Sequence, residues 1–202
     1  MKTGNNFNVE SAITVYHGSF IEIQKPVLDY SRKNTDFGIG FYLTKDKKMA
    51  DKWATVKNPP VVNSYILYLY GLTLYTFNAD EEWFDFVVAN RKGLNVDTIY
   101  NKFDVLFGPT ADDKLFTALS EYLEGAIPKE LALEMVSSSQ LNHQLCIKSQ
   151  KGLENLKFQY SKTLKGKELQ DYIEQFKYDS IEGSNRYKKL KQQFLGGTYF
   201  NG

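Results

Sequence analysis

Two glycine-containing segments near the N-terminus of this 202-residue chain constrain its fold more than any other feature. Residues 12–19 form a run rich in β-branched and aromatic residues that ends in the sequence His-Gly-Ser. Residues 36–44 read Asp-Phe-Gly-Ile-Gly-Phe-Tyr-Leu-Thr and lead into a polar segment of helical character, residues 45–55. Residues of the first kind favour half-buried strands, and glycine permits a tight bend or bulge beside them. The pattern predicts two strands bordered by glycine. It is not the dinucleotide fingerprint of a Rossmann fold, because the glycine spacing differs and a strand follows.

The rest of the chain predicts a mixture of short strands and helices in irregular order. Hydrophobic periodicity indicates strands over residues 61–70, 103–107, 144–147 and 157–164, and helices over residues 80–91, 111–124 and 129–138. We expect a short helix after Ser149, and two polar helical segments around Gly183 from Gly166 onward. Because helices and strands do not alternate regularly, the chain is predicted to be α+β rather than doubly wound.

Composition limits the class of protein and its surroundings. The 24 acidic and 25 basic residues nearly cancel, which gives no support for a nucleic-acid binder with a large basic face. A single cysteine excludes an intramolecular disulfide framework and favours a reducing compartment. No run reaches the ~18 apolar residues of a membrane span, and residues 1–10 lack the apolar core of a signal peptide. We therefore expect a soluble, cytoplasmic protein that makes no membrane contact.

The first two strands carry side chains suited to holding a planar, charged ring. Gly18 would let a flat ring approach the main chain, and His17, mostly neutral at pH 7, is expected to donate to a ribose hydroxyl. Tyr42 offers a face for stacking on a pyridinium, a contact worth roughly 1–2 kcal/mol when desolvated. Trp53, eleven residues later, is expected to form the opposite wall. Purely structural roles for His17, as a hydrogen-bonded strand end, and for Trp53, as a core anchor, remain open.

Taken together, these motifs resemble the ADP-ribosyltransferase superfamily, which includes poly(ADP-ribose) polymerases and diphtheria-type toxins. In that superfamily a His-Gly-(Ser/Thr) strand holds the nicotinamide amide and the adenine ribose of NAD, and a Phe-Gly-x-Gly-aromatic-Tyr strand stacks on nicotinamide. The residues that match these two motifs and the following helix are His17, Gly18, Ser19, Phe37, Gly38, Gly40, Tyr42 and Trp53. The superfamily's third motif is a glutamate at the start of a later strand, and that place is occupied by Gln144.

The resemblance is closer still to a bacterial family of unknown function, DUF3990. Its members carry Tyr-His-Gly-Ser, Asp-Phe-x-x-Gly-Phe-Tyr and three later motifs in a fixed order. The corresponding segments here are residues 16–19, 36–42, 82–86, 103–113 and 143–147, with Phe103 and Ile147 as substitutions. The similarity covers about residues 14–158 and leaves out the C-terminal forty or so residues.

The resemblance implies an ADP-ribosyltransferase-like α+β fold of two short mixed β-sheets packed face to face with flanking helices. It implies a domain over residues 1–165 and a C-terminal helical extension, residues 166–202, packed on or next to it. The NAD cleft would lie between the strands of His17 and Tyr42. Residues 129–138 and the turn leading to Gln144 would form the surface that recognises the target.

The implied function is NAD-dependent mono-ADP-ribosyl transfer to an intracellular macromolecule, with cleavage of the nicotinamide–ribose bond, as in a bacterial toxin or defence effector. NAD would be the co-substrate, no metal would be required, and the acceptor would be a protein or a nucleic acid. A neutralising partner protein is also compatible with this function. Two alternatives stay open: a non-catalytic protein that binds NAD or ADP-ribose, and an NAD glycohydrolase.

Gln144 makes the chemistry uncertain, because glutamine keeps a hydroxyl contact and loses the charge. A charge pair at ~4 Å and an effective dielectric constant of ~20 is worth about 4 kcal/mol. Asp112 is the candidate replacement acid, against an ordinary helix-capping role. Asp104, a charge within a predicted strand, needs a partner that Arg91 or Arg32 could supply. Arg32 is also the candidate for binding the NAD pyrophosphate.

Overall fold

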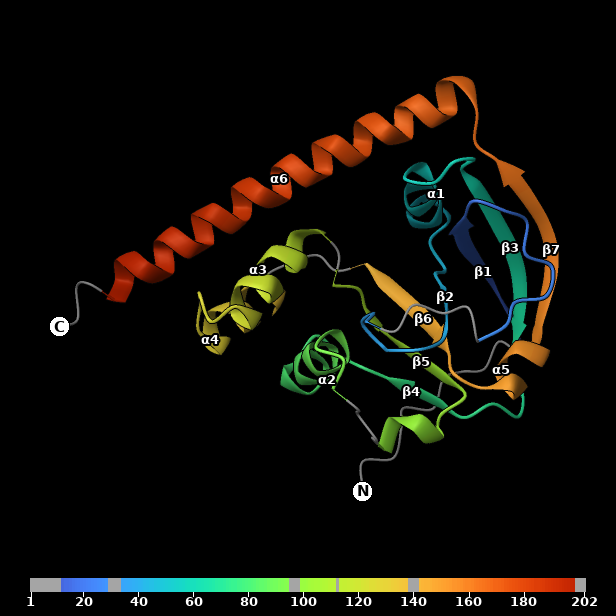
Figure 1. Ribbon diagram of the computed structural model, residues 1–202, viewed down its shortest axis with the longest axis horizontal. Helices are drawn as coiled ribbons and strands as arrows, with labels where there is room; N and C mark the ends of the chain where they lie inside the picture. Colours follow the sequence, from blue (N-terminus) through green and yellow to red (C-terminus); the bar gives the residue numbers. More distant parts are fainter. Residues whose placement is uncertain (1–11, 29–33, 95–98, 112, 138–141, 199–202) are drawn as a thin grey trace.

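The protein is described by a computed structural model over residues 12–28, 34–94, 99–111, 113–137 and 142–198. Within these ranges helices and strands mix without regular alternation, which confirms the predicted α+β class (Figure 1). No helix of the described residues is apolar over a length sufficient to cross a membrane.

Seven strands form two sheets within the described residues. The first sheet has the order β1-β3-β7 and consists of β1 (Ala12–Ser19), β3 (Val61–Tyr68) and β7 (Leu156–Thr163). The second has the order β2-β6-β5-β4 and consists of β2 (Phe41–Leu43), β6 (His143–Ile147), β5 (Val105–Pro109) and β4 (Leu74–Thr76).

The prediction of two mixed sheets is wrong for the first of them. Both strand pairs of the first sheet are antiparallel, and the parallel pair is β4 with β5 in the second sheet. Parallel neighbours need a crossover connection, and helix α2 (Glu81–Arg91) lies between β4 and β5 in the chain and supplies one. The periodicity does not predict the strand β4 or the 3₁₀ helix η1 (Ile99–Lys102), since each is only a few residues long.

The two sheets pack face to face around a shared apolar core. Val15 and Tyr65 of the first sheet meet Phe41, Leu43 and Ile147 of the second in this core. On its other face the second sheet is covered by α2, α3 (Asp113–Leu123) and α4 (Lys129–Ser137), while α1 (Lys47–Thr55) covers the first sheet (Figure 1). The alternation of side chains along each strand therefore decides which layer a residue faces.

Helix ends follow the capping residues that the sequence offers. The Asp80 side chain accepts a hydrogen bond from Trp83 N at the start of α2. Ser149 does the same for Gly152 N at the start of α5 (Gln150–Glu154), which confirms the short helix expected after Ser149.

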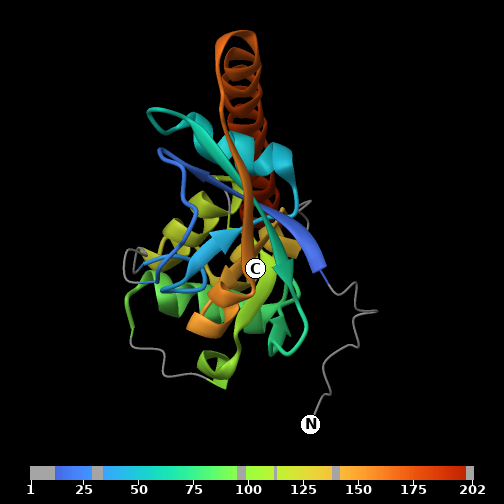
Figure 2. The same cartoon turned by 90° about the vertical axis from the view of Figure 1, so that its right-hand side faces the viewer.

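The C-terminal segment is one helix, α6 (Gly166–Thr198), and the prediction of two helical segments around Gly183 is wrong. Gly183 lies on a buried stripe of α6, whose members recur at helical spacing and contact α1, α3 and α4. These contacts outweigh the weak helix propensity of glycine, which costs roughly 1 kcal/mol. Figures 1 and 2 show α6 as an unbroken rod that runs from the end of β7 past α1 to α3 and α4.

Candidate functional site

The edges of the two sheets meet at one backbone pair and then separate. Tyr16 N donates to Thr44 O at 2.8 Å, and Thr44 N donates to Tyr16 O at 3.0 Å. Backbone groups alternate in direction along a strand, so Gly18 and Tyr42, two residues from this pair, direct their N–H and C=O groups into the same space. No Gly18–Tyr42 backbone hydrogen bond closes that space among the described residues. The backbone pairing of the two strands is therefore interrupted at the end of β1, and we call this interruption the gap.

His17 lies beside this gap, and its hydrogen bond to Tyr42 places a proton on Nδ1. The His17 Nδ1 atom lies 2.7 Å from Tyr42 O, and its ring packs against Phe41 at 4.6 Å between centroids. A carbonyl oxygen only accepts, so Nδ1 carries the proton and Nε2 of the neutral ring is an acceptor. The prediction that His17 donates to a ribose hydroxyl stays a prediction: with Nδ1 bonded to Tyr42 O, the neutral ring would accept from that hydroxyl through Nε2, and the doubly protonated ring would donate to it.

Gly18 is required by the packing of α1 against β1. A Cβ atom at this position would lie 2.6 Å from Ala50 O and 2.7 Å from Ala54 N, both backbone atoms of α1. It would also lie 2.9 Å from Trp53 Cβ, so the helix brings the half-buried Trp53 next to Gly18, as the motif spacing predicts. Only the backbone edge of Gly18 faces the gap.

Tyr42 is locked in place through its hydroxyl group. Its Oη donates to Gly38 O at 2.8 Å, accepts from Phe37 N at 2.9 Å and lies 2.8 Å from Thr35 Oγ1. Burial of the hydroxyl raises the pKa of Tyr42 well above its usual value, so the group stays protonated. Its ring is half-buried and packs on Phe37, which is fully buried and would influence a ligand only through Tyr42.

Glycine is required at two positions of the turn before β2, for a different physical reason at each. Gly38 has a φ of 70°, a region that other residues rarely adopt. Gly40 packs against β6, where a Cβ atom would collide with Cys146 Sγ and lie 2.7 Å from Ile147 O. Both glycines therefore position Tyr42 through the backbone, and neither offers a side chain to a ligand.

Gln144 is nearly sealed, with 4% of its surface exposed, and its amide is part of a buried network. Gln144 Nε2 donates to Asp36 Oδ2 at 2.8 Å and lies 3.4 Å from Pro109 O. The same carboxylate accepts from Arg91 and from Ala111 N. By strand alternation Gln144 shares the helix-covered face of the second sheet with Tyr42 and Cys146.

The other predicted residues either lie outside the described part of the chain or have other partners. Arg32, Asp112 and the turn before Gln144 lie outside the described residues. Ser19 is buried, and its hydroxyl oxygen accepts from Ile21 N at 3.4 Å. The expected pairing of Asp104 with Arg91 is wrong, because Arg91 pairs with Asp36 on another face of the molecule.

Asp104 instead joins β5 to neighbouring loops. Its carboxylate accepts from Thr73 N and Thr73 Oγ1 and from Ser149 Oγ, and Lys151 Nζ lies 3.6 Å away. Its role is therefore structural. The sequence could not reveal these partners, since they lie 31 and 45 residues away along the chain.

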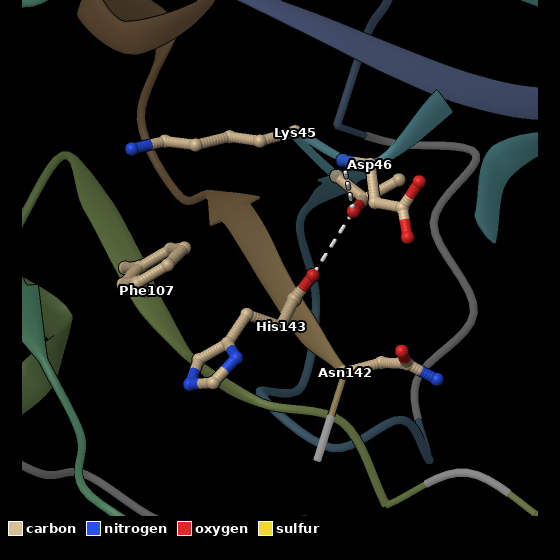
Figure 3. A pocket seen from close by; sticks show the side chains of 6 residues that line it. Lys45, Asp46, Phe107, Asn142 and His143 are labelled. Atoms are coloured by element: carbon tan, nitrogen blue, oxygen red, sulfur yellow. Dashed lines mark hydrogen bonds between the residues drawn. The ribbon is translucent and has the colours of Figure 1, made fainter. Parts of the chain in front are cut away.

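An open pocket of about 390 Å³ lies at the ends of β2, β5 and β6, and sequence reasoning missed it (Figure 3). The His143 ring stacks on Phe107 at 5.4 Å between centroids, and Lys45 Nζ lies 5.2 Å from the centroid of the same ring. Alternation places His143 and Phe107 on the face opposite Gln144. The pocket offers a cation, an imidazole and an aromatic ring, and it is separate from the gap beside Gly18.

Comparison with known proteins identifies the family. Residues 13–158 match the family described as "Protein of unknown function (DUF3990)". The chain belongs to this family. The DUF3990 match begins in β1, ends in β7 and leaves out α6. No curated protein and no solved structure matches the chain. Among the described residues, no group of three or more His, Cys, Asp or Glu side chains is placed to hold a metal ion.

Proposed function

We propose that this DUF3990 protein is an NAD-dependent mono-ADP-ribosyltransferase with an ADP-ribosyltransferase-like fold. The observation that carries the proposal is the gap where β1 and β2 separate, bordered by His17, the backbone edge of Gly18 and Tyr42. Trp53 stands next to Gly18 on α1. These are the residues on which the sequence resemblance rests, and the fold brings them to one place.

The gap suits the nicotinamide half of NAD. The Gly18 N–H would donate to the carboxamide oxygen and the Gly18 C=O would accept from its NH₂ group, as a neighbouring strand would do. Trp53 and Tyr42 would provide aromatic surfaces for the pyridinium ring. His17 Nε2 would accept from a ribose hydroxyl, in the tautomer that the bond to Tyr42 O imposes.

In the proposed reaction the bond between the nicotinamide nitrogen and ribose C1′ breaks, and its electron pair leaves with nicotinamide. A nucleophile of a macromolecular acceptor, protein or nucleic acid, forms the new bond to C1′ and loses its proton to solvent or to a base of the acceptor. The sugar gains oxocarbenium character, which a bond to the 2′-hydroxyl stabilises. Gln144 would make that bond as a neutral acceptor, so we expect turnover two to three decades below that of a carboxylate-bearing site.

A second candidate is a protein that binds NAD or ADP-ribose without reacting. The observation that favours it is the commitment of the Gln144 amide to Asp36 in a nearly sealed position. Because residue 144 is a glutamine, this position of β6 supplies no carboxylate. An NAD glycohydrolase, in which water takes the place of the acceptor, is the third outcome that the experiment below distinguishes.

The experiment is transfer of label from NAD tagged on its adenosine to components of a bacterial lysate. The variants are His17→Ala and, as a matched control, His143→Ala, an exposed histidine on the other face of the sheet. The proposal predicts labelled acceptor with wild type and His143→Ala, and at least tenfold less with His17→Ala. Equal nicotinamide release with and without lysate would indicate a glycohydrolase. Calorimetric NAD binding without any product would indicate a binding protein, and no binding would contradict all three.

A further inference from the structure

A buried carboxylate lies directly behind Gln144. We propose that Asp36 is a positioning residue, which fixes the side-chain amide of Gln144 so that Oε1 is the atom presented to a bound ligand. The ligand group that this atom would recognise is a hydroxyl donor. The choice of a ribose hydroxyl as that donor rests on the proposed function.

The orientation of the amide follows from its partners. Gln144 Nε2 lies 2.8 Å from Asp36 Oδ2 and 3.4 Å from Pro109 O. A carboxylate and a carbonyl oxygen only accept hydrogen bonds, so the opposite orientation would face Oε1 against two acceptors. The NH₂ group must therefore point inward.

The outward atom of the amide is Oε1. Gln144 Oε1 accepts no hydrogen bond from any described residue. It is not fully enclosed either, since Tyr187 Oη is the one side-chain nitrogen or oxygen atom of the described part that is both buried and without a hydrogen bond. The small exposed fraction of Gln144, 4%, therefore includes an acceptor atom.

Asp36 cannot turn away from Gln144, because other groups hold both of its oxygens. Oδ1 accepts from Arg91 Nε at 2.8 Å and from Arg91 Nη2 at 2.5 Å, while Oδ2 accepts from Ala111 N at 2.9 Å. Arg91 is itself anchored by donating to Ala111 O at 2.9 Å. The carboxylate is 7% exposed and sits in a fixed frame.

This arrangement transmits part of a negative charge to the ligand side. An amide that donates to a carboxylate is polarised, and its oxygen becomes a stronger acceptor. The pair Asp36–Gln144 would thus act on a ribose hydroxyl through the amide, where the resembling superfamily carries a glutamate. It also accounts for glutamine at this position, because Gln144→Glu would bring two carboxylates together in a buried site.

The first test reads the amide directly and needs no ligand. Nitrogen-15 NMR follows the Gln144 NH₂ signals in wild type, Asp36→Asn and Asp104→Asn. Asp104 is a matched control, since it is also a buried carboxylate with several donors and has no contact with Gln144. In Asp36→Asn the new side-chain amide would turn its own NH₂ group toward Gln144, so that two donors would face each other. We therefore expect the Gln144 NH₂ protons, which exchange slowly in wild type, to exchange fast in Asp36→Asn and in no other variant. Unchanged exchange in Asp36→Asn, or the same change in both variants, would overturn the proposal.

The second test asks whether a hydroxyl is recognised. The probes are NAD and its analogue that lacks the 2′-hydroxyl of the nicotinamide ribose. We expect wild type and Asp104→Asn to bind NAD about tenfold more tightly than the analogue, the effect of one good hydrogen bond, and Asp36→Asn to lose this preference. Equal preference in all three proteins would overturn the proposal. Failure of wild type to bind NAD at all would contradict the proposed function, while the NMR result would still decide the role of Asp36.

Discussion

At the scale of single residues, the glycines of the two N-terminal motifs are required by close packing or by backbone conformation. Gly18 lets α1 approach β1 so closely that a Cβ atom would meet two backbone atoms of the helix. Gly40 allows the same closeness to β6, and Gly38 supplies a positive φ. The strands and Trp53 are thereby brought to the gap beside His17.

Gly18→Ala should therefore destabilise the protein even without any ligand. The methyl group would force α1 away from β1, and overpacking of this kind costs typically 1–3 kcal/mol. Gly196→Ala is the control, because a Cβ atom there meets no atom within 4 Å and alanine favours helix. Chemical denaturation should show a lower free energy of unfolding for Gly18→Ala only, and equal stability of both variants would contradict the close packing.

The hydroxyl of Tyr42 should contribute to stability as well as to the site. Tyr42→Phe would leave Phe37 N without its acceptor, and Gly38 O would lose one of the two hydroxyl donors that approach it. Loss of such buried partners costs about 1–3 kcal/mol. Tyr178→Phe removes an exposed hydroxyl that bonds to Glu182 and should change unfolding by only a few tenths of a kcal/mol. Urea denaturation of both variants tests this, and a neutral Tyr42→Phe would argue against the locked turn.

Single residues also show where sequence reasoning ends. The glycine turn, the Ser149 cap and the closeness of Trp53 to Gly18 follow from local spacing, so they could be predicted. The bond between Asp36 and Gln144 spans 108 residues and leaves no periodic signal in the sequence. The tautomer of His17 likewise depends on the Tyr42 carbonyl, whose position only the fold determines.

At the scale of elements, the sequence predicts strands and helices best where one face is buried. Periodicity places α2, β3 and β7 correctly to within a few residues. It fails for β4, whose three residues are too few to show alternation, and for α6, where tertiary contacts override Gly183. The prediction of mixed sheets, which came from the resemblance, is wrong for the first sheet, whose two strand pairs are both antiparallel.

Asp104 links β5 to α5, and we expect the contribution of its carboxylate to the free energy of unfolding to depend on pH. Burial alone would raise the pKa of Asp104, but the hydrogen bonds from Ser149 and Thr73 and the charge of Lys151 outweigh burial and lower the pKa below its usual value. A lowered pKa means that the folded state holds the proton less tightly than the unfolded chain. The stabilisation is therefore complete above the unfolded value and is lost as pH falls through the folded value.

Thermal unfolding of wild type and Asp104→Asn from pH 7 down to pH 2 measures this effect. At pH 7 we expect the variant to be less stable by about 1–3 kcal/mol, through loss of charged hydrogen bonds. The difference should shrink as the pH approaches the acid end of the range. If the difference in stability between wild type and Asp104→Asn stays constant with pH, the charge of Asp104 does not contribute to stability.

At the scale of the whole molecule, two sheets share one core, and in the part of the chain that the structure describes their edges meet at one backbone pair, Tyr16 with Thr44. Helices α1 and α2–α4 cover the outer faces, and α6 spans both helical groups. Two ion pairs reinforce this span, Lys52 with Asp179 near α1 and Lys191 with Glu121 on α3. The gap that we assign to NAD lies at the junction of the two sheets, where β1 and β2 part.

Titration of nitrogen-15-labelled protein with NAD, followed at the Gly18 backbone amide, tests this assignment most directly. We predict that the Gly18 N–H and the Trp53 indole N–H shift together and saturate with one binding constant, because Trp53 stands next to Gly18 on α1. His143 and its neighbours should shift little, since none of His17, Gly18, Tyr42 and Trp53 lines their pocket. An unmoved Gly18 amide at saturating NAD, or shifts confined to the His143 pocket, would contradict the account.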